Sequence, residues 1–443
     1  MSGLQEPSFE QLAVRAVEYA TKRGADEAAA TVRKGRSISV QYRDGDLELL
    51  REAQSSALSI FLFVDNRYSS HSTCDLRPTT LDGFIDHAIE LTRLLGQDPC
   101  RRLADPKLYE GRPDDDLEIW DPAYQDLDPE RRKALAREAE AVARANEGPI
   151  ISATGSYTDQ QSVMTRVHSN GFSGAQRGTQ FWVGAEVSVR DAGERRPEDW
   201  HFAGSRRISM LPSPAEVGSQ AAKRAVARMG QKKLSSGETR VLVDSRAAGR
   251  LVGALVGAMS GAALQQKRSF LLDRLGQRIA SPLLTLIDDP LLPGGFGSRH
   301  FDSDGISSRR RRLIGEGVLE EYLLDVYYAL KLGAEPTGGG TSNLVFSGGE
   351  HDVAGLAKEM GSGIYVTGIL GGNTDGTTGD FSHGIVGFEV SGGSIKGPVG
   401  EMNITGTHAD LWDRLIAVGN DPYPYSANRV PSLLFDSVAV SGA

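Results

Sequence analysis

The sequence predicts an α+β fold, with helix and antiparallel-sheet layers in an N-terminal segment, a second α+β segment, and a β-rich C-terminal domain with a few packed helices. Helix patterns bracket runs of alternating apolar residues twice before residue 230, and strand patterns with glycine turns dominate after it. A chain of 443 residues, 39% hydrophobic and 24% charged, is long enough for two or three domains with ample cores. We expect an N-terminal α+β domain over residues 1–111, a middle α+β domain over 112–230 and a β-rich C-terminal domain over 231–443.

The first segment begins with Ser8-Phe9-Glu10-Gln11, a capping-box pattern that predicts a helix ending near Gly24. Asp44-Gly45 is a turn signal between two runs of alternating apolar residues. We expect strands at 37–43, 47–52, 57–64 and 67–73, followed by a second helix at about 81–95. Proline and charged residues between positions 105 and 116 indicate the first domain boundary.

The second segment also places helices on either side of a sheet. Asp128-Pro129 predicts a capped, alanine-rich helix that extends to about Asn146. Asn170-Gly171 is a strong hairpin signal, and strands are expected near 151–158, 162–168 and 179–190. The sequence from Ser213 to Glu216 combines a cap, a proline and a capping-box acid, which predicts a closing helix that ends at Gly230.

The third segment opens with a strand at 241–244 and a glycine-striped helix capped by Asp244 or Ser245. Each glycine costs a helix interior about 1 kcal/mol relative to alanine, so four of them require a reason. They occupy every fourth position, at Gly249, Gly253, Gly257 and Gly261.

Residues four apart share a helix face, so these glycines leave a slot without side chains where another backbone can come close. The slot indicates either tight helix packing inside the core or contact with a substrate or partner chain. The uncharged run from 251 to 264 argues against a membrane span, because it is shorter than the roughly 18–20 residues that a span requires.

After this helix we expect a strand at 283–287, a hairpin of strands 309–314 and 318–324, and a helix at 350–360. The sequence Asp302-Ser303-Asp304-Gly305 is similar to the start of a calcium loop, but the twelfth position is Leu313 rather than glutamate, which favours a polar turn. Arg309–Arg312 resembles a nucleic-acid patch. In a strand only two of these arginines share a face, which favours a solvated or salt-bridged strand over contact with an acidic partner.

Composition and missing motifs narrow the function classes. The net charge of −9 argues against a nucleic-acid binder, which needs a basic face. The sequence contains no Gly-x-Ser-x-Gly elbow, no phosphate or dinucleotide loop and no His-Glu dipeptide. The two cysteines, Cys74 and Cys100, suit a reducing compartment. Without a visible secretory signal, we expect a cytoplasmic location.

The most suggestive polar cluster is Gly379, Asp380, Phe381, Ser382 and His383. Its Asp, Ser and His types are those of acid–base or nucleophilic catalysis, but sequence neighbours rarely align as a triad, which favours a structured turn with a hydrogen-bonded aspartate. A metal-free hydrolase that uses these three polar residues is the weakest of our hypotheses. His351 and His408 are expected to open helices at the surface. Glycine runs at 338–340 and 371–372 could admit an extended peptide beside exposed backbone, but plain turns are the favoured interpretation of each run.

Several ordered stretches resemble one known family. They are Ser269-Phe270-Leu271 with Leu275-Gly276, Leu286-Ile287-Asp288-Asp289-Pro290, residues 301–310 with the hairpin 315–325, Gly379-Asp380-Phe381-Ser382, residues 417–421 followed by 431–433, and Ser169-Asn170-Gly171-Phe172. Together they resemble the TldD/PmbA family, and specifically its PmbA branch, also called TldE. The resemblance covers nearly the whole chain.

The resemblance implies a cytoplasmic protein associated with metal-dependent proteolysis of unfolded peptides. The TldD branch holds its metal with a His-Glu-x-x-x-His helix and a later cysteine. Here the corresponding helix is the glycine-striped one, at 246–261, which has neither His nor Glu, and residues 421–431 contain no cysteine. The resemblance therefore implies no metal, no cofactor and no catalytic residue in this chain.

A TldD-type partner subunit would then carry the zinc or iron. We expect the residues at 379–383 to bind the peptide and the four striped glycines to pack closely or meet a partner. The alternative is a catalytically silent homodimer that binds peptides or modulates another protein. Neither hypothesis involves nucleic acid or membrane.

Overall fold

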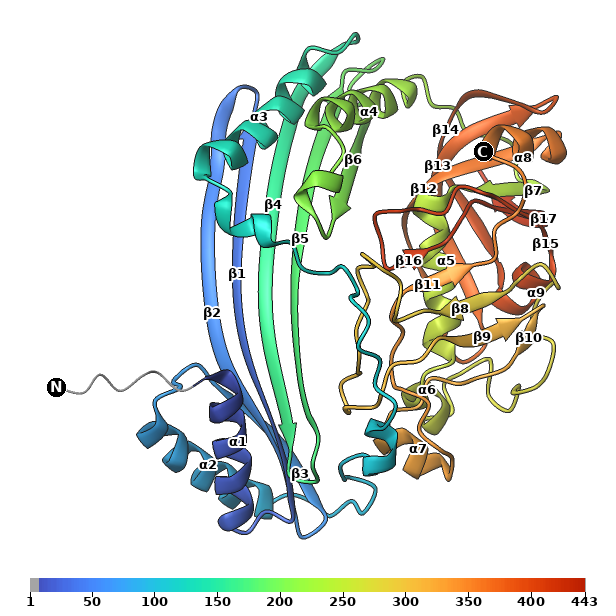
Figure 1. Ribbon diagram of the computed structural model, residues 1–443. Coiled ribbons are helices and arrows are strands. Elements are labelled where there is room, and N and C mark those ends of the chain that lie inside the picture. Colours follow the sequence, from blue (N-terminus) through green and yellow to red (C-terminus); the bar gives the residue numbers. More distant parts are fainter. Residues whose placement is uncertain (1–7, 443) are drawn as a thin grey trace.

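The computed structural model describes residues 8–442 and confirms the α+β fold (Figure 1). A tall curved sheet with helices at its two ends forms the N-terminal half, and a body of shorter strands and helices stands beside it. The first half contains, in order, α1 (Phe9–Lys22), β1 (Glu27–Arg43), β2 (Asp46–Val64), β3 (Arg67–Thr73), α2 (Pro78–Arg93), η1 (Pro106–Tyr109), η2 (Pro122–Asp126), α3 (Pro129–Arg144), β4 (Ile150–His168), β5 (Ser173–Val189), β6 (Glu198–Ser205), η3 (Ile208–Met210) and α4 (Pro214–Ala227).

The first six strands form one antiparallel sheet, the long sheet, in the order β3-β2-β1-β4-β5-β6. Its centre is the pairing of β1 with β4, which runs from Ala29 opposite His168 to Arg43 opposite Thr154. The two predicted N-terminal segments therefore share one ladder of backbone hydrogen bonds.

The strands are longer than the sequence analysis predicts. The predicted strands 47–52 and 57–64 are both part of β2, and 151–158 and 162–168 are both part of β4. The predictions at 37–43 and 179–190 miss the first residues of β1 and β5. The predicted strands are too short because they stop where polar residues interrupt the apolar alternation, as from Lys34 to Arg36 in β1, and they miss buried residues beyond that point such as Val32. At those polar residues the cross-strand ladder keeps the backbone extended without an apolar face.

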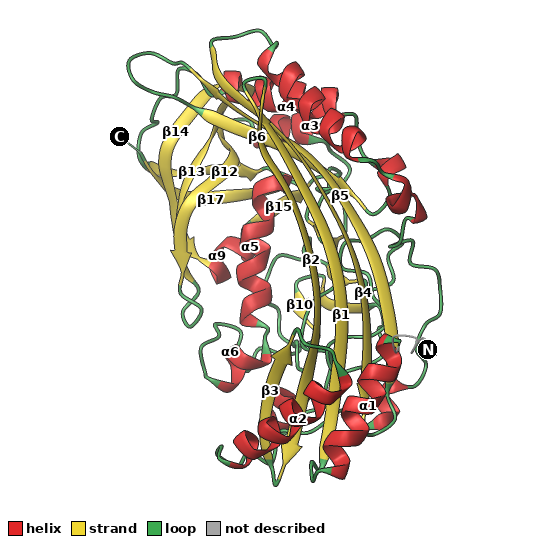
Figure 2. Cartoon of the chain, turned by 90° about the vertical axis from the view of Figure 1, so that its left-hand side faces the viewer, coloured by secondary structure: helices red, strands yellow, loops and turns green. Residues whose placement is uncertain are grey.

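The helices cover one face of the long sheet at its two ends (Figures 1 and 2). Leu58, Ile60 and Leu62 of β2 pack under α1 and α2, while residues of β1 and β5 pack under α3 and α4. Helix α3 approaches β4 very closely, because an added Cβ at Gly155 would lie 2.3 Å from the carbonyl oxygen of Ala136.

The second half, called the C-terminal part, consists of residues 237–442. Its elements are β7 (Gly237–Val243), α5 (Ser245–Ala258), α6 (Gly261–Gln265), β8 (Leu286–Asp288), β9 (Arg311–Gly315), β10 (Val318–Leu319), α7 (Val326–Leu332), β11 (Leu344–Phe346), α8 (Val353–Met360), β12 (Gly363–Thr374), β13 (Asp380–Ser391), β14 (Ser394–Thr407), α9 (His408–Asp413), β15 (Leu415–Val418), β16 (Asn428–Arg429) and β17 (Leu433–Ser441). The β-rich C-terminal region is thus confirmed.

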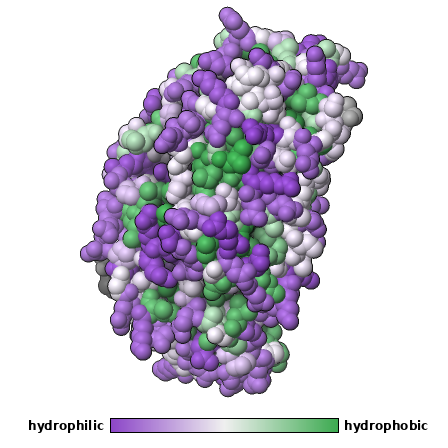
Figure 3. Space-filling model, turned by 90° about the vertical axis from the view of Figure 1, so that its right-hand side faces the viewer, coloured by the Kyte–Doolittle hydropathy of each residue, from purple (hydrophilic) through white to green (hydrophobic). Residues whose placement is uncertain are grey.

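Two sheets share the core of the C-terminal part. The larger has the order β14-β13-β12-β7-β17-β15, and a further pairing of β14 with β17 curls it toward a barrel. The smaller has the order β10-β9-β8-β11-β16. The buried side of α5 contributes Leu251, Val252 and Leu255 to this core. On the flank that points away from the long sheet, apolar residues reach the surface among hydrophilic ones (Figure 3).

Side chains fix the C-terminal part against the N-terminal half. The guanidinium of Arg101 lies 3.5 Å from the ring centre of Tyr327 in α7 and 4.7 Å from that of Tyr68 in β3. Lys331 of α7 forms an ion pair of 2.9 Å with Asp98. Within residues 8–442, no helix combines the length and apolar character needed to cross a membrane.

Candidate functional site: the groove beside the glycine-striped helix

Helix α5 begins as predicted, because the carboxylate of Asp244 accepts a hydrogen bond from the backbone N–H of Arg246. The predicted helix with four striped glycines is wrong at its end: Gly249, Gly253 and Gly257 lie in α5, whereas Gly261 is the first residue of α6, which Ser260 caps. An added Cβ would meet nothing within 4 Å at Gly249, Gly253 or Gly257, whereas at Gly261 it would lie 2.5 Å from Cβ of Tyr328. Close packing within this chain therefore explains Gly261, and the other three glycines leave helix backbone open. A contact of these three with a substrate or partner stays a prediction.

A groove of about 270 Å³ lies at the start of α5, where the C-terminal part meets β6. Arg246 and Arg250 of α5 line it and share a helix face with the open glycines, because they precede Gly253 and Gly257 by seven residues. The guanidinium of Arg246 lies 4.7 Å from the ring centre of Trp200 and forms a 3.3 Å ion pair with Asp199. This arrangement holds the arginine across the junction of the two halves.

The opposite wall of the groove is a free strand edge. Strand β12 pairs with β7 only over residues 363–366, while it pairs with β13 along its whole length. Residues 367–374 therefore have β13 as their one neighbouring strand among the described residues. The Nη2 of Arg250 donates a 2.9 Å hydrogen bond to the carbonyl oxygen of Gly372 on this edge. Leu370 and Trp200 are exposed at 57% and 41% and give the groove its apolar surface.

The predicted polar cluster lies one strand away from this edge, because Ser382 of β13 pairs with Asn373 of β12 on the side opposite the free edge. The structured turn predicted there is wrong for most of the cluster: only Gly379 precedes β13, and its φ of +81° ends the turn. The aspartate is hydrogen-bonded as expected, with Oδ2 of Asp380 accepting from the hydroxyl of Thr378 at 2.6 Å.

The geometry separates the cluster into two faces. Successive residues of a strand point to opposite sides, so Asp380 and Ser382 face outward while Phe381 and His383 face the core. His383 is buried at 2% exposure, and neither of its ring nitrogens has a hydrogen-bond partner among the described residues. Burial lowers its pKa, and the positive charge of Arg250 lowers it further. Ser382 therefore has no histidine base in its own cluster.

The prediction for His408 was also wrong, whereas His351 is exposed as expected. His408 opens α9 but is fully buried, with its ring stacked on Phe270 at a centroid distance of 5.5 Å. Burial lowers the pKa of His408 to about 4, and the neighbouring His383 adds to this effect. A neutral imidazole can pack like an aromatic ring, which a lone histidine in a sequence does not reveal.

The residues present do not fit a catalytic metal ion. Within the described chain, no three side chains of His, Cys, Asp or Glu gather in a metal-binding arrangement. Helix α5 itself offers only serine, arginine and aliphatic side chains. The sequence resembling a calcium loop is a turn, in which Oδ1 of Asp302 accepts hydrogen bonds from the N–H groups of Asp304 and Ile306.

Sequence reasoning singled out the glycines but missed the residues that line the groove. Arg246 and Arg250 stand four residues apart beside the stripe, and a helical projection would have placed them on its face. The sequence gives no such signal for Trp200 and Leu370, because only the folded chain brings them beside α5.

Comparisons with known proteins agree with this architecture. Residues 122–229 match the PmbA/TldA metallopeptidase central domain, and residues 236–442 match the PmbA/TldA metallopeptidase C-terminal domain. The metalloprotease PmbA of Escherichia coli O157:H7 is 32% identical over 99% of this chain and 97% of its own length. The metalloprotease PmbA homolog of Haemophilus influenzae is also 32% identical, with the same coverage.

Solved structures show the same fold. A putative modulator of DNA gyrase from Bacteroides thetaiotaomicron is 39% identical, with a TM-score of 0.95 over 98% of both chains. TldE from Thermococcus kodakarensis shares the fold at 20% identity, with a TM-score of 0.85 over 97% of this chain and 100% of its own. The chain belongs to the PmbA/TldD metallopeptidase family. Within that family it is consistent with the PmbA/TldE branch, and family membership links it to proteolysis.

Proposed function

We propose that this chain is the non-metal subunit of a TldD/TldE-type metallopeptidase complex in the cytoplasm and that it helps to hold unfolded peptides for cleavage. The observation that carries the proposal is the groove, where open helix backbone at Gly253 and Gly257 lies on the same helix face as the arginines beside the unpaired edge of β12. The zinc or iron would belong to the TldD-type partner.

An extended peptide can add itself to a sheet edge by main-chain hydrogen bonds, which require little sequence specificity but do require an unfolded substrate. The free edge at 367–374 offers such backbone groups, and the glycines of α5 leave room for a chain above the helix. Arg246 and Arg250 would attract carboxylates of the peptide, and Leu370 would contact its apolar side chains.

The proposal is tested by reconstitution. We expect the purified chain alone to leave an unstructured peptide intact, and the chain mixed with a TldD-type partner to cleave it. A chelator should abolish cleavage by the mixture, because the metal ligands belong to the partner. Mass spectrometry of the peptide detects cleavage, and size measurement of the proteins detects formation of the complex.

Two outcomes would overturn the proposal. One is cleavage by this chain alone in chelator, and the other is an inactive mixture with a partner known to be folded. A stable homodimer that ignores the TldD-type protein would favour the silent peptide-binding or modulator hypothesis.

Replacing Ser382 with alanine tests the remaining hydrolase hypothesis. Loss of a nucleophile typically costs about a millionfold in rate, whereas loss of one neutral hydrogen bond costs at most about tenfold. We expect the smaller effect, because the side chain of His383 lies on the opposite face of β13. The measurement is peptide cleavage by the reconstituted complex, and a loss beyond a thousandfold with unchanged folding would restore Ser382 as a nucleophile.

A further inference from the structure

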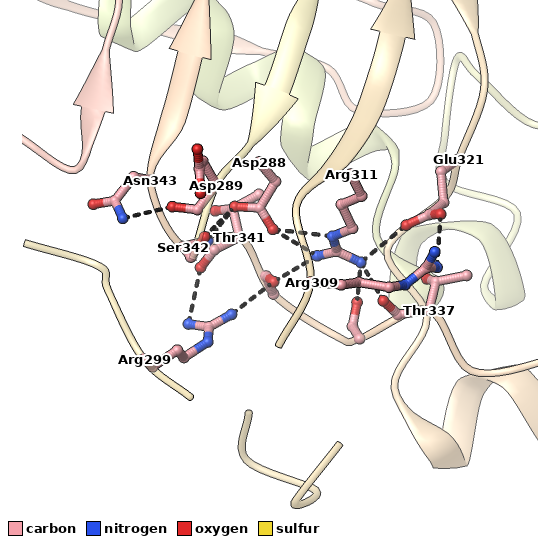
Figure 4. Close-up of polar contacts among 12 residues, drawn as sticks. Asp288, Asp289, Arg299, Arg309, Arg311, Glu321, Thr337, Thr341, Ser342 and Asn343 are labelled. Carbon is pink, nitrogen blue, oxygen red and sulfur yellow. Dashed lines mark hydrogen bonds and ion pairs between the residues drawn. The ribbon is translucent and has the colours of Figure 1, made fainter. Parts of the chain in front are cut away.

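A second cavity, of about 370 Å³, lies between the segment 107–111 of the N-terminal half and two loops of the C-terminal part at 299–311 and 336–340. It is separate from the groove beside α5 and shares no lining residue with it. Figure 4 shows the charged wall of this cavity, where side chains of β8, β9 and the neighbouring loops meet. Neither the family comparisons nor the proposed function uses it.

Arg311 is the most buried cation of this wall, and its hydrogen-bonding capacity is fully used. Its guanidinium pairs with the carboxylate of Asp288 at 3.0 Å and with that of Glu321 at 3.2 Å. It also donates to the carbonyl oxygens of residues 337, 338 and 340. Since Arg309 is held by Glu321 as well, these charges balance one another and hold the wall in place (Figure 4).

Arg299 and Asp302, by contrast, are each half-satisfied. Nη1 and Nη2 of Arg299 donate to the carbonyl oxygens of Thr341 and Gly340, while its buried Nε has no partner among the described residues. Oδ1 of Asp302 accepts two backbone hydrogen bonds, while its buried Oδ2 likewise has no partner within the described chain. Both residues line the cavity, and no ion pair within 4 Å joins them.

Space is kept open in front of the free carboxylate oxygen. Gly338 has a φ of +98°, and an added Cβ would lie 3.4 Å from Oδ2 of Asp302. Burial raises the pKa of Asp302 to about 6, with a second contribution from the charge of Asp304. The positive charge of Arg299 acts in the opposite direction but does not offset burial. Contact with a cationic donor stabilises the charged form of a carboxylate whose pKa burial has raised.

We propose that this cavity binds a small zwitterion, an α-amino acid or a short peptide, with its ammonium group beside the carboxylate of Asp302 and its carboxylate beside the guanidinium of Arg299. A simple anion would leave the aspartate unpaired, and a simple cation would leave the arginine unpaired. A ligand that carries both charges pairs with both side chains, which offsets two desolvation costs at once. Lys107 and Glu110 are exposed at the rim and present both signs of charge to an arriving zwitterion.

Calorimetric titration of the full chain with L-leucine and with L-alanyl-L-alanine tests the proposal. We expect at least one of them to bind saturably and to raise the unfolding temperature. N-acetyl-L-leucine lacks the ammonium group and L-leucinamide lacks the carboxylate, as do the corresponding blocked dipeptides. Each blocked form of the ligand that binds should bind about ten- to a hundredfold more weakly, because each loses one charged hydrogen bond.

The variant Asp302→Asn tests whether the ligand binds at this aspartate. Asp302→Asn keeps Oδ1 as an acceptor for the two backbone N–H groups and replaces the charged Oδ2 with a neutral amide NH2, so it should fold and lose affinity about ten- to a hundredfold. Asp413→Asn, the same change at an exposed position at the end of α9, should bind like the parent protein. No saturable binding, equal binding of blocked and free ligands, or unchanged affinity in Asp302→Asn would each overturn the proposal.

Discussion

Replacing Arg311 with methionine should destabilise the protein by about 3–5 kcal/mol, the usual cost of breaking a buried ion pair from one side. The carboxylate of Asp288 is 2% exposed and would keep its hydrogen bonds from Ser342 but lose its cation. Three carbonyl oxygens would also lose their common donor. Denaturant unfolding followed by fluorescence measures the change in the free energy of unfolding.

The adjacent residue in β9 supplies a matched control. Arg312 points to the opposite side, where it pairs with Glu320 at 2.6 Å in a largely exposed position. Arg312→Met should therefore change the free energy of unfolding by less than about 1 kcal/mol. Similar losses from both variants would contradict the assignment of Arg311 as the structural arginine of this strand.

Replacing Gly249, Gly253 and Gly257 together with alanine should stabilise the isolated chain by about 2–3 kcal/mol. Alanine is favoured over glycine in helix interiors by about 1 kcal/mol per residue, and nothing stands within 4 Å of the added methyl groups. In the reconstituted complex the same change should lower peptide cleavage, because the methyl groups occupy the space where the peptide is proposed to pass. Stability and activity would then move in opposite directions.

Gly261, the first residue of α6, is the control. Its added methyl group would clash with Tyr328, so Gly261→Ala should destabilise the chain by about 1–3 kcal/mol. Unfolding in denaturant and cleavage by the mixture with a TldD-type subunit are measured for both variants. A triple variant that is stabilised yet fully active would remove the glycines from the peptide path.

Helix starts could be predicted from the sequence because capping is local. Ser8, Asp128 and Ser213 each accept a hydrogen bond from a backbone N–H three residues later, as their sequence contexts predict. The turn at Asn170-Gly171 was confirmed for the same reason, since it joins β4 directly to β5. These signals need no information from distant parts of the chain.

Strand lengths and site geometry depend on distant partners. The polar run from Arg33 to Arg36 remains in β1 because β2 and β4 pair with it on both sides. The Arg309–Arg312 prediction was confirmed as a salt-bridged segment, since alternation along a strand is local. That Arg299 and Asp302 line one cavity could not be predicted, because the partners of the arginine are carbonyl groups some forty residues away.

The pairing of β1 with β4 also determines how the chain can be divided. Each strand is the inner neighbour of the other, so a fragment that stopped near residue 111 would expose a long row of unpaired N–H and C=O groups. Such an edge can pair with other chains. The remaining part of the chain, which contains β4, would expose the matching edge. From α1 to α4 the molecule should therefore melt, refold and withstand proteolysis as one cooperative unit, even though its helices gather at two separate ends.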